Sequence, residues 1–217
     1  MIRLYALPLS AYCTKVRTVL RIKQVPFEEC KPLGGHYSND SYRQHMPPGS
    51  IPAIEEGEFK LFDSEAIVEY LEDAYPEVPM RDHDPQLCAW QRAVAQFHNA
   101  KLEPAVRALF PIVKVAPEKR KLYAIEDALA VFNDALRKLE TVIEPNPFIG
   151  GTEPCLADCG FPATLRMGGD IFSHLGSEVI FSKKVSIWMA ALETHSVIGD
   201  EVKKNRGAAS EWVQQFQ

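Results

Sequence analysis

The first 75 residues switch repeatedly between the two-residue period of a strand and the three-to-four-residue period of a helix. Residues 11–24 show the helical period clearly, because Val16, Val19 and Leu20 are apolar while Lys15 is charged. The pattern predicts strands at 2–6, 27–30, 51–55 and 59–62 and helices at 11–24 and 63–74. The polar segment between the second and third strands has room for at most one short helix. The predicted order is therefore βαβαββα.

Beyond residue 85 the apolar residues recur only at the three-to-four-residue spacing of helices. A linker containing Pro76 and Pro79 precedes this part. The predicted helices span 86–110 with a kink near Pro104, then an apolar stripe from Leu122 to Val142, and finally 156–175 and 182–197. We expect an α/β plus all-α protein, with an N-terminal α/β domain at 1–78 and an α-helical domain at 86–217.

Composition and charge narrow the class of partner. The 217 residues are 46% hydrophobic and 24% charged, as in an ordinary soluble globular protein, and the net charge of −5 disfavours a nucleic-acid partner. Charges interrupt every apolar run before it reaches the length of a membrane span. The start of the chain resembles a strand and has no signal segment. We therefore expect a cytoplasmic protein with no membrane partner.

The five cysteines do not form a recognisable framework. Their number is odd and no pair has Cys-x-x-Cys spacing, which disfavours disulfides and a two-cysteine redox motif. Cys155 and Cys159 can share a helix face, but no histidine pair at ligand spacing completes a zinc site with them. We expect no metal site and no permanently bound cofactor.

The Ile51-Pro52 bond opens a predicted strand and allows two interpretations. A trans proline is tolerated at the first position of an edge strand, and only about one X-Pro bond in twenty is cis. A cis bond would instead turn the amide and carbonyl of Ile51 toward solvent, where a peptide ligand can pair with them as an extra strand. The βαβαββα order around the bond favours the second interpretation.

Asp63 and Ser64 open the next predicted helix. Both are preferred N-cap residues, although neither has a glutamate or glutamine three positions later to complete a capping box. The same geometry offers free amides and a hydroxyl to a ligand carboxylate. The two roles are compatible because a hydroxyl has one donor and two acceptor sites.

Ser10 lies between the first strand and the first helix, where it can cap the helix by accepting from the amide of Cys13. A capping serine keeps its own proton to donate, and a ligand thiolate is a suitable acceptor. Lowering a thiol pKa by about two pH units requires about 3 kcal/mol. A hydrogen bond to a charged group supplies roughly 1.5–3 kcal/mol and a helix N-terminus about 0.3–2 kcal/mol. A neutral serine is therefore sufficient to activate a bound thiol.

Cys13 is the competing nucleophile, since thiols in the first turn of a helix are acidified. The alternative role is a small buried residue that packs the helix on the sheet, and we favour that role.

Four segments in this order resemble the cytosolic glutathione transferase superfamily, over nearly the whole chain. Residues 7–13 are similar to the active-serine segment of the delta and theta classes, and Lys15-Val16-Arg17 to that of the zeta and tau classes. Residues 46–54 resemble the segment Asn-Pro-x-Gly-x-Val-Pro-x-Leu, which carries a cis proline. Asp63-Ser64 matches a Glu-Ser pair, and residues 148–158 resemble the folding signature of the helical domain.

The resemblance implies a thioredoxin-like N-terminal domain and a homodimer that uses reduced glutathione as co-substrate. It implies that Ser10 hydrogen-bonds the sulfur of glutathione and that Asp158 is a structural helix cap. The residues implied to bind the rest of glutathione are Ile51, Pro52, Asp63 and Ser64. A hydrophobic electrophile is implied to lie against Leu9, Tyr12, Phe97 and Phe110. Trp90 and Phe97 could serve the dimer interface instead.

Several positions depart from the family pattern. Met46 replaces the asparagine, Cys155 replaces a capping Ser or Thr, and Asp63 is shorter than the usual glutamate. Gly49-Ser50 lacks the residue that often reaches the glycine carboxylate of glutathione. The sequence offers three substitutes for that residue: His36, Arg43 and His45.

Three functions remain open on the sequence alone. The first is conjugation of glutathione to a small hydrophobic electrophile. The second is a glutathione-dependent thiol transferase, isomerase or dehalogenase, and the third is a non-catalytic binding protein that keeps the fold.

Overall fold

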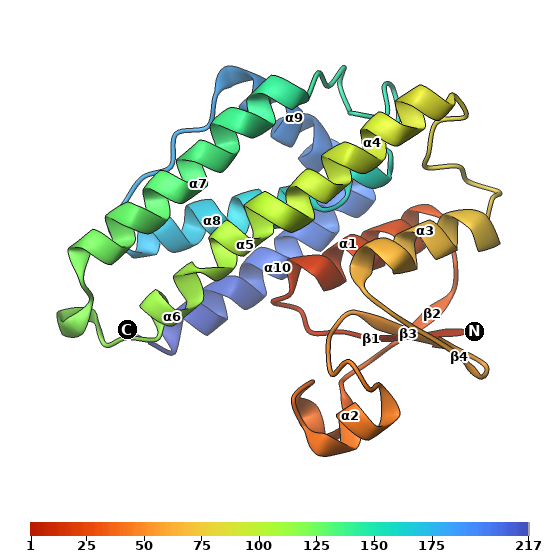
Figure 1. The fold of residues 1–217 in the computed structure, drawn as a ribbon, viewed down its shortest axis with the longest axis horizontal. Helices are drawn as coiled ribbons and strands as arrows, with labels where there is room; N and C mark the ends of the chain where they lie inside the picture. The colour runs from red at the N-terminus through yellow and green to blue at the C-terminus, as the bar shows by residue number, and fades with distance from the viewer. Residues whose placement is uncertain (217) are drawn as a thin grey trace.

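The N-terminal part of the chain forms one four-stranded sheet with helices on both faces (Figure 1). The computed structural model describes residues 1–216. The strands are β1 (Ile2–Tyr5), β2 (Phe27–Cys30), β3 (Ala53–Glu56) and β4 (Phe59–Phe62). Their order is β2-β1-β3-β4, with β1 parallel to β2 and antiparallel to β3, and with β3 antiparallel to β4.

Alternation along the strands gives each face of the sheet its own core. Leu4 and Ile54 point to the face covered by the helices α1 and α3, whereas Tyr5 and Ala53 point to the face covered by α2. The bounds of these helices are Ala11–Ile22 for α1, Asp40–His45 for α2 and Ser64–Ala74 for α3. A 3₁₀ turn, η1 (Leu33–Gly35), precedes α2. Met46, which departs from the family pattern, is buried beneath α2.

The rest of the described chain is helical and surrounds a larger core. Its α-helices are α4 (Pro85–Phe97), α5 (Glu103–Arg107), α6 (Leu109–Val113), α7 (Leu122–Val142), α8 (Phe161–His174), α9 (Lys183–Thr194) and α10 (Ser196–Gln214). Shorter turns are η2 (His98–Leu102), η3 (Pro117–Lys119) and η4 (Leu156–Asp158). The α/β plus all-α fold expected from the sequence is confirmed.

One predicted helix shows its expected kink, and another differs from the structure in extent. The helix expected at 86–110 with a kink near Pro104 is interrupted by the π-helical segment η2, which ends two residues before Pro104, so the kink is confirmed. Proline lacks an amide donor and its ring crowds the carbonyl four residues earlier, so the α-helical ladder cannot continue through that turn. The helix expected at 182–197 is instead α9 followed by α10, which the sequence pattern did not delimit.

The apolar stripe of α7 is buried only in its middle. Phe132, Leu136 and Leu139 lie in the core, whereas Leu122 and Val142 at the two ends are 67% and 38% exposed. The apolar stripe predicted from the sequence is therefore present on one helix, and its two end positions are exposed. The helix extends beyond the elements that cover its centre.

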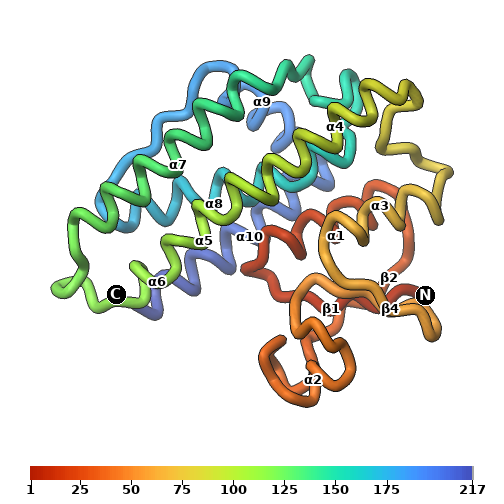
Figure 2. The backbone as a smooth tube through the Cα atoms, in the orientation of Figure 1, coloured from red at the N-terminus to blue at the C-terminus, as the bar shows by residue number. Residues whose placement is uncertain are grey.

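Helix α10 joins the two parts of the molecule. Figure 2 shows it running from the side of α1 to the neighbourhood of α6. Arg17 of α1 donates to Glu201 of α10 at 2.8 Å, and Arg21 donates to the same carboxylate at 2.7 Å. This contact fixes the first helix of the sheet domain against the last helix of the chain.

Among residues 1–216, no helix combines the length and the apolar composition needed to cross a bilayer.

Candidate active site

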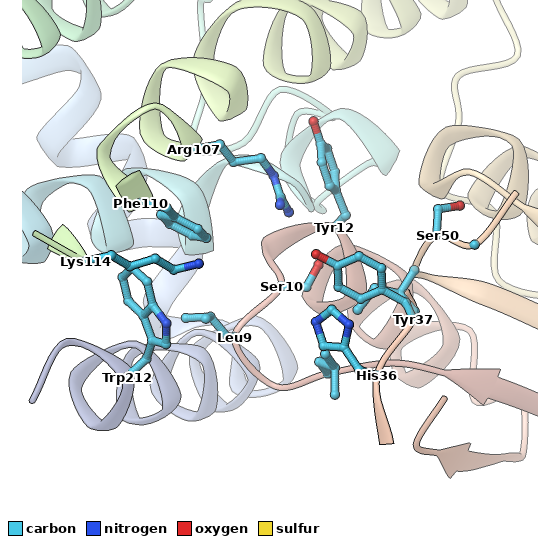
Figure 3. A pocket seen from close by; sticks show the side chains of 13 residues that line it. Leu9, Ser10, Tyr12, His36, Tyr37, Ser50, Arg107, Phe110, Lys114 and Trp212 are labelled. Carbon is cyan, nitrogen blue, oxygen red and sulfur yellow. The ribbon is translucent and has the colours of Figure 1, made fainter. Parts of the chain in front are cut away.

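A cavity of about 480 Å³ opens between the sheet domain and the helical region (Figure 3). Its lining comes from the β1–α1 loop, the start of α1, the segments around η1 and β3, the α5–α6 turn and α10. The lining residues are Leu7, Leu9, Ser10, Tyr12, His36, Tyr37, Gly49, Ser50, Ile51, Arg107, Phe110, Lys114 and Trp212. The cavity therefore needs both parts of the chain.

Ser10 lies on the floor of this cavity as the N-cap of α1. Its Oγ accepts from the amide of Cys13 at 3.3 Å, and its side chain is nearly buried, with the residue 8% exposed. Both the cap geometry and the position beside an open cavity agree with the role that the sequence suggests. The hydroxyl proton stays available for a ligand, because an acceptor interaction with an amide does not use it.

The loop before Ser10 is held by α10. Asn205 is fully buried and donates through Nδ2 to the carbonyls of Pro8 and Leu9, at 3.0 Å each. The position of Ser10 in the cavity thus depends on a side chain almost two hundred residues away.

The segment before β3 forms another part of the cavity wall that the sheet domain contributes. The Ile51-Pro52 peptide bond is cis. Ile51 lines the cavity, whereas Pro52 is buried and does not line it. The hydroxyl of Tyr42 donates to the carbonyl of Ser50 at 3.0 Å and fixes this segment on α2. Gly49 has a φ of +60°, and a Cβ there would lie 2.9 Å from Cγ of Arg43, so this turn requires glycine.

Asp63 and Ser64 lie at the start of α3 and do not line the cavity as these side chains stand. The Asp63 carboxylate caps α3 by accepting from the amides of Glu65 and Ala66, at 2.9 and 3.2 Å. Its backbone has a φ of 74°, a region that non-glycine residues rarely adopt and that often accompanies functional sites. Ser64 is 5% exposed.

Tyr12 forms the roof between α1 and the helical region. Its hydroxyl donates to the carbonyl of Asn99 at 3.4 Å and points away from Ser10 in Figure 3. Burial, together with the nearby carboxylates of Glu103 and Asp63, raises the pKa of Tyr12 to about 12. Tyr12 consequently offers the cavity the face of a neutral ring and no phenolate.

The helical region adds residues that the sequence analysis did not single out. Arg107, Lys114 and Trp212 of this region line the cavity, as does Tyr37 of the sheet domain, between η1 and α2. The Arg107 guanidinium lies 5.0 Å from the centre of the Tyr12 ring. Leu9 and Phe110, which the family resemblance assigns to the electrophile pocket, also line the cavity. Arg107 precedes Phe110 by three residues on a helical stretch, so the two share a face, and that spacing was the available signal.

Phe97, which the sequence analysis places in the electrophile pocket, lies outside this cavity. It packs, half-buried, against the core of the helical region together with Trp90. The π-helical turn η2 that follows α4 separates the face of α4 from the face that continues into α5. A regular helix through residue 110 would have placed Phe97 and Phe110 differently relative to each other.

Comparison with known proteins identifies the fold and the family. Residues 4–79 match the family model for the glutathione S-transferase N-terminal domain. The chain is also 33% identical over 162 residues to glutathione S-transferase Z2 of Arabidopsis thaliana, covering 72% of each protein. The chain belongs to the glutathione S-transferase family. It is an enzyme family, and its N-terminal domain is thioredoxin-like.

Two further proteins are similar to this chain in sequence or in fold. The chain is 27% identical over 161 residues to the probable maleylacetoacetate isomerase 2 of Drosophila melanogaster, covering 72% of this chain and 69% of that protein. Human glutathione transferase theta-2, solved in complex with glutathione, shares the fold with a TM-score of 0.81. That comparison covers 100% of this chain and 90% of the human one at 20% identity.

In this family member Cys13 is a core residue. It is fully buried between α1 and the sheet, and burial raises the pKa of its thiol. Cys13 is absent from the cavity lining, so a ligand in the cavity has no access to its sulfur in this structure. Cys155 and Cys159 are also buried, each with a thiol pKa raised by burial.

Asp158 organises the helical region away from the cavity. Its carboxylate accepts from the amides of Ile149, Gly150 and Cys155 at 2.9 to 3.2 Å, and from Nε1 of Trp188 at 2.8 Å. This is the capping arrangement expected from the sequence, and it also ties η4 to α9. The four donors compensate for burying a fully enclosed carboxyl group.

Proposed function

We propose that this chain binds reduced glutathione in the cavity between its two parts and conjugates it, through its sulfur, to a small hydrophobic electrophile. The observation that supports the proposal most strongly is Ser10, whose hydroxyl caps α1 on the floor of a cavity lined by Ile51. The glutathione thiolate would accept the Ser10 proton in a hydrogen bond while the amides of the first turn of α1 add their positive potential.

The backbone of Ile51 would pair with the cysteinyl part of glutathione as an added strand. Asp63 and Ser64 would bind the γ-glutamyl end, after a rearrangement of the start of α3 that lets them face the ligand. Among the three substitutes for the glycine-carboxylate contact, His36 is favoured because it lines the cavity. His45 is instead engaged on the far face with Glu55 and Tyr5, at 3.0 and 3.1 Å.

The electrophile would occupy the side of the cavity formed by Leu9, Tyr12, Phe110 and Trp212. The rings of Phe110 and Trp212 lie 4.7 Å apart, centre to centre, and make a continuous apolar wall. Such a wall favours an apolar or aromatic acceptor through burial rather than through hydrogen bonds.

A glutathione-dependent isomerase is the second candidate. It is favoured by the similarity to a protein named as a probable maleylacetoacetate isomerase. In that reaction glutathione adds to a double bond and leaves again, so the same Ser10-stabilised thiolate would serve. A thiol transferase or dehalogenase that uses Cys13 is disfavoured by the burial of that thiol. The homodimer and the cytoplasmic location remain predictions.

Replacing Ser10 tests the mechanism. We expect Ser10→Ala to lower kcat/KM for conjugation by about tenfold to a hundredfold, since one hydrogen bond to a charged group is lost. Ser10→Thr should restore part of the rate because it restores a hydroxyl. Thiolate formation is measured directly from the ultraviolet absorbance of bound glutathione against pH, and its pKa should rise in Ser10→Ala.

Cys13→Ala is the matched control, one helical turn away. It should keep the activity and the thiolate pKa, with some loss of stability from the cavity it leaves. Activity lost in Cys13→Ala and kept in Ser10→Ala would contradict the mechanism. Calorimetry with millimolar glutathione separates an enzyme from a non-catalytic relative, because absence of binding heat would contradict every glutathione-dependent function.

A further inference from the structure

Positive charge is concentrated in the cavity of an otherwise acidic protein. Arg107 and Lys114 line it, and no lining residue is an aspartate or glutamate among the residues that the structure describes, although the chain as a whole carries a net charge of −5. Both cations come from the helical region, on the same side as Phe110 and Trp212 (Figure 3). A purely apolar acceptor would leave these two charges unused.

We propose that Arg107 and Lys114 form an anion subsite for the acceptor, so that the preferred electrophile carries a carboxylate beside its apolar body. This inference rests on the proposed function, because it names the class of acceptor used in the same transfer. It goes further in predicting that the neutral hydrophobic electrophile is the poorer substrate.

Arg107 is held in place for this role from behind. Glu103 lies one turn earlier on α5, and its Oε1 is 3.0 Å from Nε of Arg107. Thr164 of α8 donates to the other oxygen of Glu103 at 2.5 Å, and the Glu103 side chain is fully buried. The Nε of Arg107 thus lies at ion-pair distance from a buried carboxylate, although the two atoms are not aligned as a hydrogen bond, and the end of the guanidinium faces the cavity (Figure 3). A planar guanidinium presented in this way suits a carboxylate.

The aromatic surroundings fix the direction of the guanidinium. It lies 5.0 Å from the centre of the Tyr12 ring and 5.9 Å from that of Phe110. Contact with ring faces keeps the charge in the cavity and reduces the competing water around it. An anion bound there interacts more strongly than it would at an open surface.

Lys114 supplies the second charge and has no ion-pair partner in the part of the chain that the structure describes. It follows α6 directly, and its side chain extends toward the cavity beside Phe110 and Trp212 (Figure 3). A lysine with a flexible stem can follow anions of different length. Arg107 would thus set the position of the carboxylate, and Lys114 would add charge.

The alternative is that the two cations bind glutathione and not the acceptor. The arrangement of the cavity argues against this alternative. The groups proposed for glutathione, Ser10, Ile51 and His36, belong to the sheet domain. The two cations face them from the opposite wall, beside the apolar residues proposed for the acceptor (Figure 3). An acceptor placed between the thiolate and that wall reaches the cations before glutathione does.

A matched pair of acceptors tests the subsite. One is a chlorodinitrobenzoate with the chlorine flanked by two nitro groups and the carboxylate opposite, and the other is its methyl ester. In both, the glutathione sulfur forms a bond to the ring carbon, the carbon–chlorine bond breaks, chloride leaves and the thiol proton goes to solvent. The measured quantity is the ratio of kcat/KM for the acid to kcat/KM for the ester.

We expect the double variant Arg107→Met with Lys114→Met to lower this ratio by about tenfold or more, the effect of losing one or two charge-assisted hydrogen bonds. Lys114→Arg keeps the charge and should keep most of the ratio, whereas Arg107→Lys keeps the charge without the planar guanidinium and should keep only part of it. Lys101→Met removes an exposed cation of the neighbouring η2 turn that lies outside the cavity, and it should leave the ratio unchanged.

An unchanged ratio in the double variant overturns the subsite. A rise in the glutathione dissociation constant with the ratio unchanged also overturns it, because the charges then serve glutathione. A readout that needs no transfer keeps the test independent of the proposed function. In calorimetry without glutathione, a dinitrobenzoate lacking the chlorine should bind more tightly than its methyl ester to the wild-type chain. The double variant should lose that difference, and equal binding to the wild type overturns the subsite even if transfer is observed.

Discussion

At the residue scale, a single buried amide connects the end of the chain to the proposed nucleophile-activating loop. Asn205 donates to two carbonyls in the loop that precedes Ser10, while its own Oδ1 is buried without a partner. An unpaired buried acceptor costs free energy, so the two donated hydrogen bonds must outweigh that cost. The arrangement favours precise placement of the loop over maximal stability.

Asn205→Ala should therefore act on both stability and thiolate formation. Two carbonyls lose their donor, and we expect the free energy of unfolding to fall by about 1–3 kcal/mol. Because Ser10 then moves relative to the bound sulfur, the pKa of bound glutathione should rise toward its value in water. Thermal unfolding and the ultraviolet absorbance of the thiolate measure the two effects separately.

Lys203→Ala, two residues earlier on the exposed face of α10, is the control and should change neither quantity. A destabilised Asn205→Ala variant that keeps the wild-type thiolate pKa would limit this residue to a structural role.

At the element scale, α10 contributes more to the site than its sequence suggests. It supplies Asn205 behind the Ser10 loop and Trp212 in the cavity wall, seven residues and two turns apart on one face. Its entry is a tight corner after α9, with only His195 between the two helices. A Cβ on Gly199 would lie 2.3 Å from the carbonyl oxygen of Glu193, so the corner requires a glycine there.

A pair of glycine substitutions on α10 tests this corner. Gly199→Ala should lower the free energy of unfolding by about 1–3 kcal/mol, because a backbone carbonyl cannot move away as a side chain can. Gly207→Ala on the same helix meets no atom within 4 Å and should raise stability by up to about 1 kcal/mol through helix propensity. Chemical denaturation of both variants gives the comparison. Equal changes in the free energy of unfolding of the two variants would show that helix propensity, rather than a close contact at Gly199, determines the effect of these substitutions.

The sequence predicts those elements whose pattern is local. Neighbouring residues are enough to predict the βαβαββα order, the N-cap at Ser10 and the apolar stripe of α7. They are also enough to predict that a strand begins after the Ile51-Pro52 bond. Phe97 was misplaced because a π-helical turn changes the face that a helix presents, and no local period reveals it. Trp212 and Arg107 were missed because their roles depend on contacts between segments about one to two hundred residues apart.

At the scale of the whole molecule, the cavity exists because the sheet domain and the helical region hold each other in one orientation. A largely buried ion cluster lies at their joint. Glu201 of α10 binds Arg17 and Arg21 of α1, and Lys204 reaches the same carboxylate at 3.0 Å. The Glu201 and Arg17 side chains are 1% and 5% exposed, so this cluster is shielded from solvent in a way that surface pairs are not.

The charge of Glu201 should make docking of the two parts depend on pH. Burial opposes ionisation of Glu201, but hydrogen bonds from Arg17, Arg21 and Lys204 outweigh it and hold its pKa below the ordinary value of 4.5. A carboxyl whose pKa is lowered by folding stabilises the fold above that ordinary value, and the contribution is lost as the pH falls through the folded-state pKa.

We accordingly expect Glu201→Gln to lower the free energy of unfolding by about 1–3 kcal/mol at neutral pH, because the buried Arg17 guanidinium then keeps only Glu29, at 3.1 Å, as its carboxylate partner. The difference from the wild type should shrink progressively as the pH falls below about 4.5. Asp200→Asn is the control: its carboxylate is 63% exposed and lies 3.5 Å from Arg21, so its loss should cost less than about 1 kcal/mol. Denaturation curves for the three proteins across this pH range decide the matter. A Glu201→Gln deficit that stays constant into acid would assign the effect to packing, whereas convergence with the wild type assigns it to the charge that joins the two halves of the cavity.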